Sequence, residues 1–191
     1  MNAGKELPER AFKSQKEWEA WLERNHGTLG VWLKLSKKGS GIPSVSYQEA
    51  VDSALCYGWI DGQARSLDDV CYLQRFTPRT ATSNWSKINR EKAEAYIAQG
   101  RMRPPGLRAI EVARANGRWE KAYEGQREMT VPEDFEKALK KNSKARKFFE
   151  TLNSKNRYSV LYRIQDARKP ETRARRIESF IAMLAEGKKI S

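Results

Sequence analysis

The stretch Tyr57–Trp85, YGWIDGQARSLDDVCYLQRFTPRTATSNW, decides the fold of the first part of this chain. Two segments in it, Ile60–Arg65 and the bulkier Val70–Phe76, are separated by Leu67–Asp69, which carries two aspartates. This pattern predicts two strands of an antiparallel hairpin with its turn at Leu67–Asp69. Asp61-Gly62 is an alternative turn, because Asp-Gly is a strong hairpin signal.

The residues before this stretch predict a helix, a strand and a second helix. Ser14 and Glu17 have the spacing of a capping box, in which Glu17 reaches back to the cap. The apolar stripe that follows is formed by Trp18, Trp21 and Leu22. The segment Gly30–Ser36 alternates apolar and other residues, which predicts a strand. A second capping box, Ser46 with Glu49, opens the next helix.

The residues after the stretch predict helices. Ser83 or Asn84 can cap a helix that runs through Ile97, and Pro104 opens another that ends at Ala115. Residues 117–131 show no clean period, and after Pro132 the apolar pattern is helical to the end of the chain.

The predicted fold class is therefore α+β. We expect a small antiparallel sheet of about three strands covered by helices, followed by an all-helical C-terminal segment. The corresponding domains are an α+β domain over residues 1–117, a linker over residues 118–131 and a basic helical region over residues 132–191.

The formal net charge of +13 is unevenly distributed. Residues 138–191 hold 15 Lys and Arg against 5 Asp and Glu. Such an excess favours a polyanion, nucleic acid or an anionic membrane surface as partner. The alternative is a solvated basic face on a helical bundle.

The cysteine and histidine content argues against a metal site. Cys56 and Cys71 have neither Cys-x-x-Cys spacing nor histidine neighbours, and His26 is the only histidine in the sequence. We therefore expect reduced core thiols, no metal and no cofactor. No run approaches the roughly 18 apolar residues of a membrane helix, and the N-terminus lacks the apolar part of a signal peptide. These features predict a cytoplasmic protein without a transmembrane segment.

The loop after Phe76 is the strongest candidate for a binding site. Arg75 and Arg79 flank the end of a predicted strand, and polar residues then lead into a helix N-terminus, where free amides bind anions. Alternatively, the polar residues only cap that helix and the arginines pair with aspartates of the hairpin. The ligand-binding residues predicted by the first hypothesis are Trp59, Asp61, Asp68, Tyr72, Arg75, Thr77, Arg79, Ser83, Asn84 and Trp85.

Several members of this set have an ordinary structural explanation. Trp59 and Trp85 can stack on a base or ring, although aromatic residues at the edge of a small sheet more often belong to the core. Asp61, Asp68 and Asp69 can act as acid or base or hold Mg²⁺, yet two of them lie where a turn needs Asp. No serine lies in a Gly-x-Ser-x-Gly motif, so no catalytic residue is assigned.

A second candidate surface is the basic corner around Pro170. It can hold nucleic-acid phosphates without reading sequence, or it can be a solvated run of charge. Its polyanion-binding residues are Arg168, Lys169, Arg173, Arg175 and Arg176.

The sequence also resembles the bacteriocin-protection, YdeI or OmpD-associated family, over about residues 7–187. The phrases that carry the resemblance are Glu49–Asp52, ALCYGWIDG at Ala54–Gly62, QRFTPR at Gln74–Arg79, Asn84–Ser86, Gly100–Met102, Pro105–Leu107, Arg157-Tyr158, Ile164, Ala167–Lys169, Thr172-Arg173 and Arg176-Ile177. The resemblance implies a bacterial, cytoplasmic protein linked by name to bacteriocin or envelope-stress tolerance. It implies no catalytic residue and no cofactor.

Three functional hypotheses follow. The first is a non-enzymatic binder of an anionic small molecule at the loop after Phe76. The second is a protein that interacts with a polyanion, an anionic surface or a protein partner through its basic C-terminal helices. The third and weakest is an enzyme that uses Asp61 and the arginines on a phosphorylated or carboxylated substrate.

Overall fold

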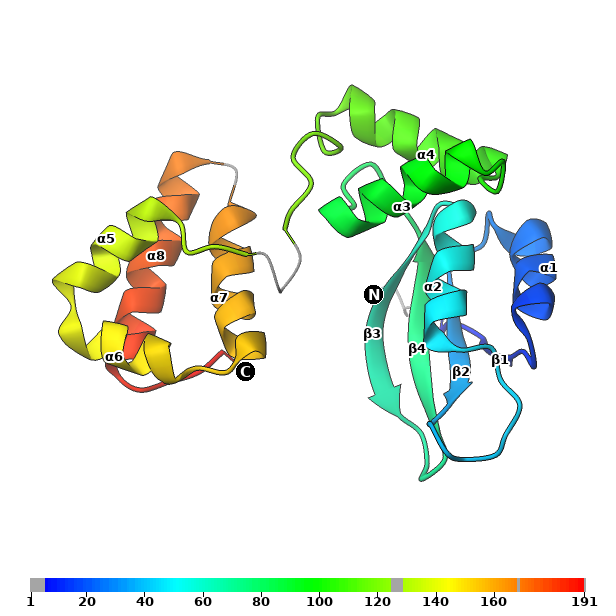
Figure 1. Cartoon of the computed structure of the whole chain (residues 1–191), viewed down its shortest axis with the longest axis horizontal. Coiled ribbons are helices and arrows are strands. Elements are labelled where there is room, and N and C mark those ends of the chain that lie inside the picture. Colours follow the sequence, from blue (N-terminus) through cyan, green and yellow to red (C-terminus); the bar gives the residue numbers. More distant parts are fainter. Residues whose placement is uncertain (1–5, 125–128, 168, 191) are drawn as a thin grey trace. The chain divides into compact units, whose positions relative to one another are not determined.

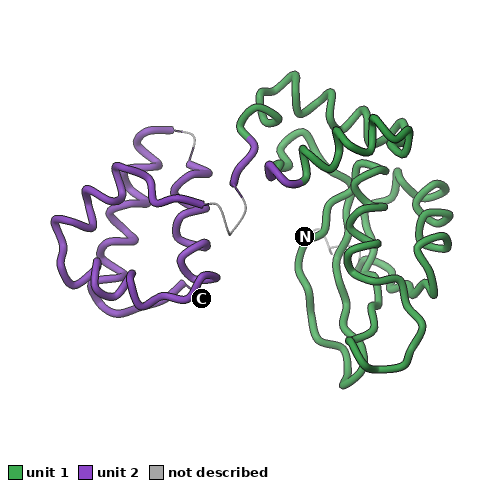
Figure 2. Tube along the Cα trace, in the orientation of Figure 1, with its two compact units in different colours: residues 1–85, 89–121 green, residues 86–88, 122–191 purple. Residues whose placement is uncertain are grey.

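The chain folds into two units, which Figure 2 shows in different colours. The computed structural model describes residues 6–124, 129–167 and 169–190. The first unit comprises Met1–Trp85 and Asn89–Lys121, and the second comprises Ser86–Ile88 and Ala122–Ser191. The predicted linker over residues 118–131 stays a prediction.

The first unit contains a mixed sheet whose described strands are β1 (Glu9–Ala11), β2 (Val31–Ser36), β3 (Trp59–Ser66) and β4 (Cys71–Pro78). Their order across the sheet is β1-β2-β4-β3 (Figure 1). β4 runs antiparallel to both of its neighbours, whereas β1 runs parallel to β2. The α+β class is confirmed, but the expected three-stranded antiparallel sheet is wrong in both number and direction.

The unpredicted strand is β1, which has only three residues, all of them exposed. It therefore carries no alternation of apolar and polar positions from which a strand could be inferred. Its place is set by β2, because the Trp32 amide donates to the Pro8 carbonyl over 2.9 Å.

The hairpin of β3 and β4 has its turn after Ser66, as predicted from Leu67–Asp69. Asp61-Gly62 is not the turn. A register shift lies there instead, between the pairs Asp61↔Phe76 and Ala64↔Gln74. The side chain of Gln74 donates to the Gly62 carbonyl over 2.8 Å at this irregularity.

Two helices, α1 (Gln15–Asn25) and α2 (Tyr47–Cys56), pack against each other beside the sheet (Figure 1). Trp18 of α1 is fully buried and contacts Phe76 of β4 and Trp59 of β3. The capping box at Ser46 is complete. At the start of α1, Ser14 caps the helix as predicted, but the Glu17 carboxylate accepts from the Lys13 amide instead of the cap amide.

The next two helices are α3 (Lys87–Ala98) and α4 (Pro104–Ala115). α4 has the predicted bounds. α3 begins later than predicted, because Ser83 accepts a hydrogen bond from the Thr80 amide inside its own turn. The side chain of Asn84 accepts from Arg118 over 2.7 Å, so neither residue caps α3.

A close backbone approach, which two glycines permit, joins the end of α2 to the start of α4. A Cβ atom on Gly106 would lie 2.2 Å from the carbonyl oxygen of Cys56, and one on Gly58 would lie 2.7 Å from that of Pro105. Gly58 also has φ +73°, a conformation that favours glycine. The Arg103 amide donates to the Cys56 carbonyl over 3.0 Å and closes the same contact.

The second unit is helical after Pro132, as predicted. Its helices are α5 (Glu133–Lys141), α6 (Ser143–Thr151), α7 (Ser154–Gln165) and α8 (Pro170–Ala185). Asn142 caps α6 and Asn153 caps α7 through their side chains. The buried core between the helices is formed by Phe135, Leu139, Ala145, Phe149, Leu152, Val160, Leu161, Ile164, Phe180 and Leu184.

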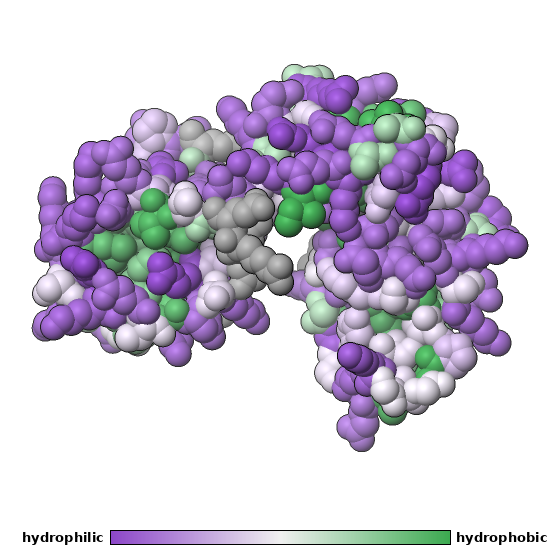
Figure 3. All heavy atoms as spheres, in the orientation of Figure 1, coloured by the Kyte–Doolittle hydropathy of each residue, from purple (hydrophilic) through white to green (hydrophobic). Residues whose placement is uncertain are grey.

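Polar side chains cover most of the surface seen in Figure 3, which agrees with the mean hydropathy of −0.82. In the described parts of the chain, no helix combines the length and the apolar character needed to cross a membrane.

Replacing Gly106 by alanine is expected to destabilise the first unit by about 1–3 kcal/mol, because the new Cβ would collide with the backbone of Cys56. Denaturant unfolding followed by tryptophan fluorescence measures this, since all six tryptophans lie in the first unit. Gly27→Ala is the matched control, because a Cβ at Gly27 meets nothing within 4 Å. Equal unfolding midpoints for the two variants would contradict the inferred contact.

Candidate functional site

A cleft of about 380 Å³ lies in the first unit, where the end of β4 faces α4. We call it the Arg79–Arg108 cleft. Its lining residues come from the loop after α1, the turn between α2 and β3, the segment after β4, and α4. They are His26, Gly27, Tyr57, Gly58, Pro78, Arg79, Thr80, Ala81, Pro105, Arg108, Ala109 and Val112.

The cleft is formed by the glycine contact described above. The Arg79 amide donates to the Gly58 carbonyl over 2.8 Å, which ties the end of β4 to the turn between α2 and β3. Gly58 in turn lies against Pro105 at the start of α4. Arg79 and Arg108, which are far apart in sequence, therefore line the same cleft.

The Arg79 side chain is held in place by an aromatic pair. Its guanidinium lies 3.9 Å from the centre of the Trp85 ring, and its Nη1 donates to the Asn84 carbonyl over 3.0 Å. Trp85 makes a T-shaped contact with Trp119, with ring centroids 4.8 Å apart. The cation therefore occupies a fixed position at the cleft wall.

The electrostatics of the cleft favour an anion. Arg79 and Arg108 contribute two positive charges, and no Asp or Glu occurs among the described residues that line the cleft. Burial and a hydrogen bond with Glu23 raise the pKa of Tyr57 to about 12, so this hydroxyl stays neutral near pH 7. His26 Nδ1 lies 2.9 Å from the Glu23 carbonyl oxygen.

Of the ten predicted ligand-binding residues, only Arg79 lines this cleft. Trp59 is 1% exposed, and its Nε1 donates to the His26 carbonyl, so its ring belongs to the aromatic core. Trp85 is 2% exposed, lies against the Arg79 guanidinium and does not line the cleft. The two tryptophans thus follow the structural alternative.

The predicted aspartates and Tyr72 lie elsewhere. Asp61 accepts a hydrogen bond from the Tyr47 hydroxyl over 2.7 Å. Asp68 accepts from the amides of Val70 and Cys71, and these bonds lower its pKa, so its role is to close the hairpin turn. Tyr72 is half-buried within β4, and burial raises its pKa.

The remaining predicted residues are also dispersed. Arg75 is exposed on β4 beside Trp32 of β2. Thr77 is half-buried, and its methyl group packs where Gly30 lacks a Cβ. Ser83 and Asn84 are used in the turn and in the bond to Arg118 already described. The structure therefore does not bring the predicted set together around one cavity.

The basic corner of the second unit also has mixed roles. Arg173 donates to both oxygens of Asp134, at 2.6 and 2.9 Å, and to the Ile164 carbonyl. Arg176 bonds the Arg163 carbonyl and pairs with Asp166 at 3.7 Å.

The other three corner residues are Lys169, Arg175 and Arg168. Lys169 and Arg175 are exposed, whereas Arg168 lies outside the described residues.

The thiols and the metal-ligating residue types form no cluster. Cys56 and Cys71 are free and buried, which confirms the prediction for them, and burial raises the pKa of Cys56 to about 11. Within the described ranges, no three His, Cys, Asp or Glu side chains gather in a way that could hold a metal ion.

Sequence reasoning missed Arg108, which was part of an ordinary predicted helix. The nearest signal in the sequence was the pair of small residues Gly58 and Gly106, since glycine in a buried helix start indicates close backbone approach. That signal predicts a contact but not which side chains flank it.

Family comparisons assign the two parts of the chain to different models. Residues 10–109 match a domain of unknown function, DUF8412. Residues 128–187 match the family described as bacteriocin-protection, YdeI or OmpD-associated, which confirms the resemblance in the C-terminal part. The phrases between Glu49 and Leu107 fall in the other match. Comparisons with curated proteins and with solved structures gave no match.

Arg173→Ala is expected to destabilise the second unit by about 1 kcal/mol, a modest value because both partners are partly exposed and solvent screens the pair. Arg175→Ala, on the same helix and exposed, is the matched control. Far-UV circular dichroism during denaturation measures the difference.

The Arg173 hydrogen bonds hold the pKa of Asp134 below its usual range. Their contribution is thus present above the unfolded pKa of about 3.9 and is lost as pH falls through the lower folded value. The gap between wild type and Arg173→Ala should shrink below about pH 4. A gap that is unchanged in acid would argue against the Asp134 pair.

Proposed function

This chain belongs to the family of the domain of unknown function that matches residues 10–109, more than half of the chain. We propose that this member of the family binds an anionic small molecule in the Arg79–Arg108 cleft. The observation that carries the proposal is that two arginines, one from the segment directly after β4 and one from α4, line one cleft that has no lining carboxylate among the described residues.

Arg108 is the residue that supplies direct anion contact. It is exposed on α4, and its charge adds to the fixed charge of Arg79 across the cleft. Arginine donates two parallel hydrogen bonds to carboxylate or phosphate. The prolines that open α4 lack amide hydrogens, so the helix start offers few donors of its own and the side chains carry the recognition.

The rest of the lining indicates what else the ligand contains. Pro78, Pro105, Ala109 and Val112 form apolar walls, and Thr80 adds a hydroxyl. A volume of about 380 Å³ lies at the lower end of the range for small-molecule sites. These features support a compact phosphorylated or carboxylated metabolite with a short apolar portion.

The proposal includes no chemical step. Asp61, which the enzyme hypothesis needs, is hydrogen-bonded to Tyr47 and does not line the cleft. A link to bacteriocin or envelope-stress tolerance is a further part of the proposal, supported by the description of the family that residues 128–187 match.

Polyanion binding by the second unit is the second candidate. It is favoured by the exposure of Lys169 and Arg175 within a segment of strongly positive charge. Arg173 and Arg176 support it less, because both are engaged within the unit.

Inorganic phosphate and glycerol 3-phosphate are suitable probes of the cleft. We expect them to raise the melting temperature of the first unit, and Arg108→Ala to weaken their binding about tenfold, as expected for the loss of a charged hydrogen-bond donor. Calorimetric titration gives the affinities. Arg75→Ala is the matched control, since Arg75 is an exposed arginine of the same unit that does not line the cleft. Equal effects of the two substitutions would refute the site.

A further inference from the structure

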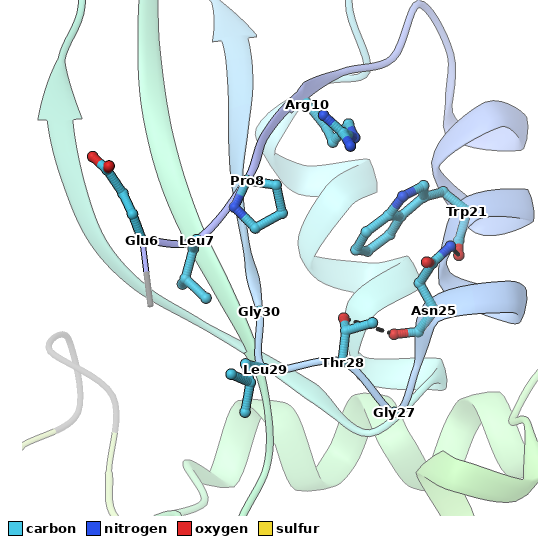
Figure 4. Close-up of a pocket in the computed structure, with 10 residues that line it drawn as sticks. All are labelled: Glu6, Leu7, Pro8, Arg10, Trp21, Asn25, Gly27, Thr28, Leu29 and Gly30. Atoms are coloured by element: carbon cyan, nitrogen blue, oxygen red, sulfur yellow. Dashed lines mark hydrogen bonds between the residues drawn. The ribbon is translucent and has the colours of Figure 1, made fainter. Parts of the chain in front are cut away.

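A second cleft of about 380 Å³ lies in the first unit between the segment before β1 and the helix α1 (Figure 4). We call it the Trp21 cleft. Its lining residues are Glu6, Leu7, Pro8, Arg10, Trp21, Asn25, Gly27, Thr28, Leu29 and Gly30. Apart from Gly27, none of them lines the Arg79–Arg108 cleft.

The Trp21 indole forms one wall and is held rigidly. It stacks on Trp18 with centroids 5.4 Å apart and ring planes within 10°. It also meets Trp59 edge-on at 5.8 Å. Figure 4 shows the indole directed from α1 toward Pro8 across the cleft. An aromatic platform with a fixed orientation can receive a second ring at little entropic cost.

The opposite wall and the floor are fixed by backbone contacts. The Pro8 carbonyl accepts from the Trp32 amide, which holds the segment before β1 on β2. The amide and the hydroxyl of Thr28 both donate to the Asn25 carbonyl, at 3.0 and 2.9 Å. Gly30, at φ +144°, is pressed against the Phe76 carbonyl and Thr77, where a Cβ would be 2.8 Å away. The cleft is therefore preformed.

Its apolar surface is open to solvent to an unusual degree. Leu29 is 70% exposed, the largest exposure among the large apolar side chains of the described chain. Leu7 and Trp21 are only partly buried. Leu29 lies in a loop that Gly30 and Thr28 fix, so its exposure is a property of the folded state.

The charge at this cleft comes from Arg10. Figure 4 shows its guanidinium turned toward Trp21, whereas the Glu6 side chain is turned away from the cleft. Arg10 Nη1 donates to the carbonyl of neighbouring Glu9, and among the described ion pairs none involves Arg10. Its remaining donors lie beside the indole, within reach of a ligand that packs there.

We propose that the Trp21 cleft binds an aromatic carboxylate. The ring packs between the Trp21 indole and Pro8, with Leu29 at the exposed rim of the cleft, and the carboxylate accepts hydrogen bonds from Arg10. An apolar platform next to a single cation selects a molecule with these two parts and disfavours an amine of the same shape. This inference is independent of the proposed function, because it uses another cleft and another cation.

The test uses the full chain and 3-phenylpropionate as probe, followed by ligand-observed NMR and calorimetric titration. The comparison ligands are 3-phenylpropylamine, which reverses the charge, and propionate, which lacks the ring. We expect 3-phenylpropionate to bind saturably and neither comparison ligand to displace it. Arg10→Gln and Leu29→Ser, both at exposed positions, should each weaken it about tenfold.

Two controls assign the effect to this cleft. Leu67→Ser removes another exposed apolar side chain, at the hairpin turn, and Arg108→Ala removes one of the two arginines of the other cleft. Both should leave the affinity unchanged. The proposal is overturned if the wild type shows no saturable binding, if the amine binds equally well, if Arg10→Gln binds like the wild type, or if Arg108→Ala abolishes binding. Failure of phosphate to bind the Arg79–Arg108 cleft would leave this inference standing.

Discussion

The close backbone approach of Gly58 to Pro105 and of Gly106 to Cys56 is the constraint on which the first unit depends. It lets the end of α2 and the start of α4 approach until backbone meets backbone, a distance that any side chain would prevent. Three features follow from it. α4 is placed beside the end of β4, Arg79 is tied to the turn before β3, and Arg108 is brought opposite Arg79. The Arg79–Arg108 cleft is thus a consequence of the close packing of α2 against α4.

The fold could be predicted from the sequence wherever the signal was local. The alternation in β2, the Asp-rich turn of the hairpin, the N-cap at Ser14, the capping box at Ser46, and the prolines that open α4 are all encoded within a few residues. β1 could not be predicted, because its pairing comes from β2 and not from its own three residues. The start of α3 was misplaced because Asn84 bonds Arg118, a partner that sequence spacing does not reveal.

The site was less predictable than the fold for a related reason. The candidate residues were chosen because they lie close together in sequence, yet a strand directs successive side chains to opposite faces. A bulge after Asp61 and the turn at Asp68 disperse the set further. Arg79 alone reaches the cleft, and its partner Arg108 comes from a helix whose pattern gave no sign of function. Some of the arginines also lie on aromatic rings, as in Arg65 over Trp32 and Arg114 over Trp119, so net charge alone does not show where anions bind.

The division of the chain has a consequence for how this protein can be rearranged. Ser86 forms an isolated β-bridge with Tyr123, and the Lys87 amide donates to the Tyr123 carbonyl. The Lys87 ammonium also pairs with Glu124. The three residues Ser86–Ile88 therefore belong to the second unit, while the chain on either side of them belongs to the first. Neither unit is a continuous segment, and a single cut cannot separate them cleanly. Recombination between the two family matches at a point before Tyr123 would split these bonds between the products. Because the two units share the chain in this way, they are expected to be exchanged together, even though each unit has its own hydrophobic core.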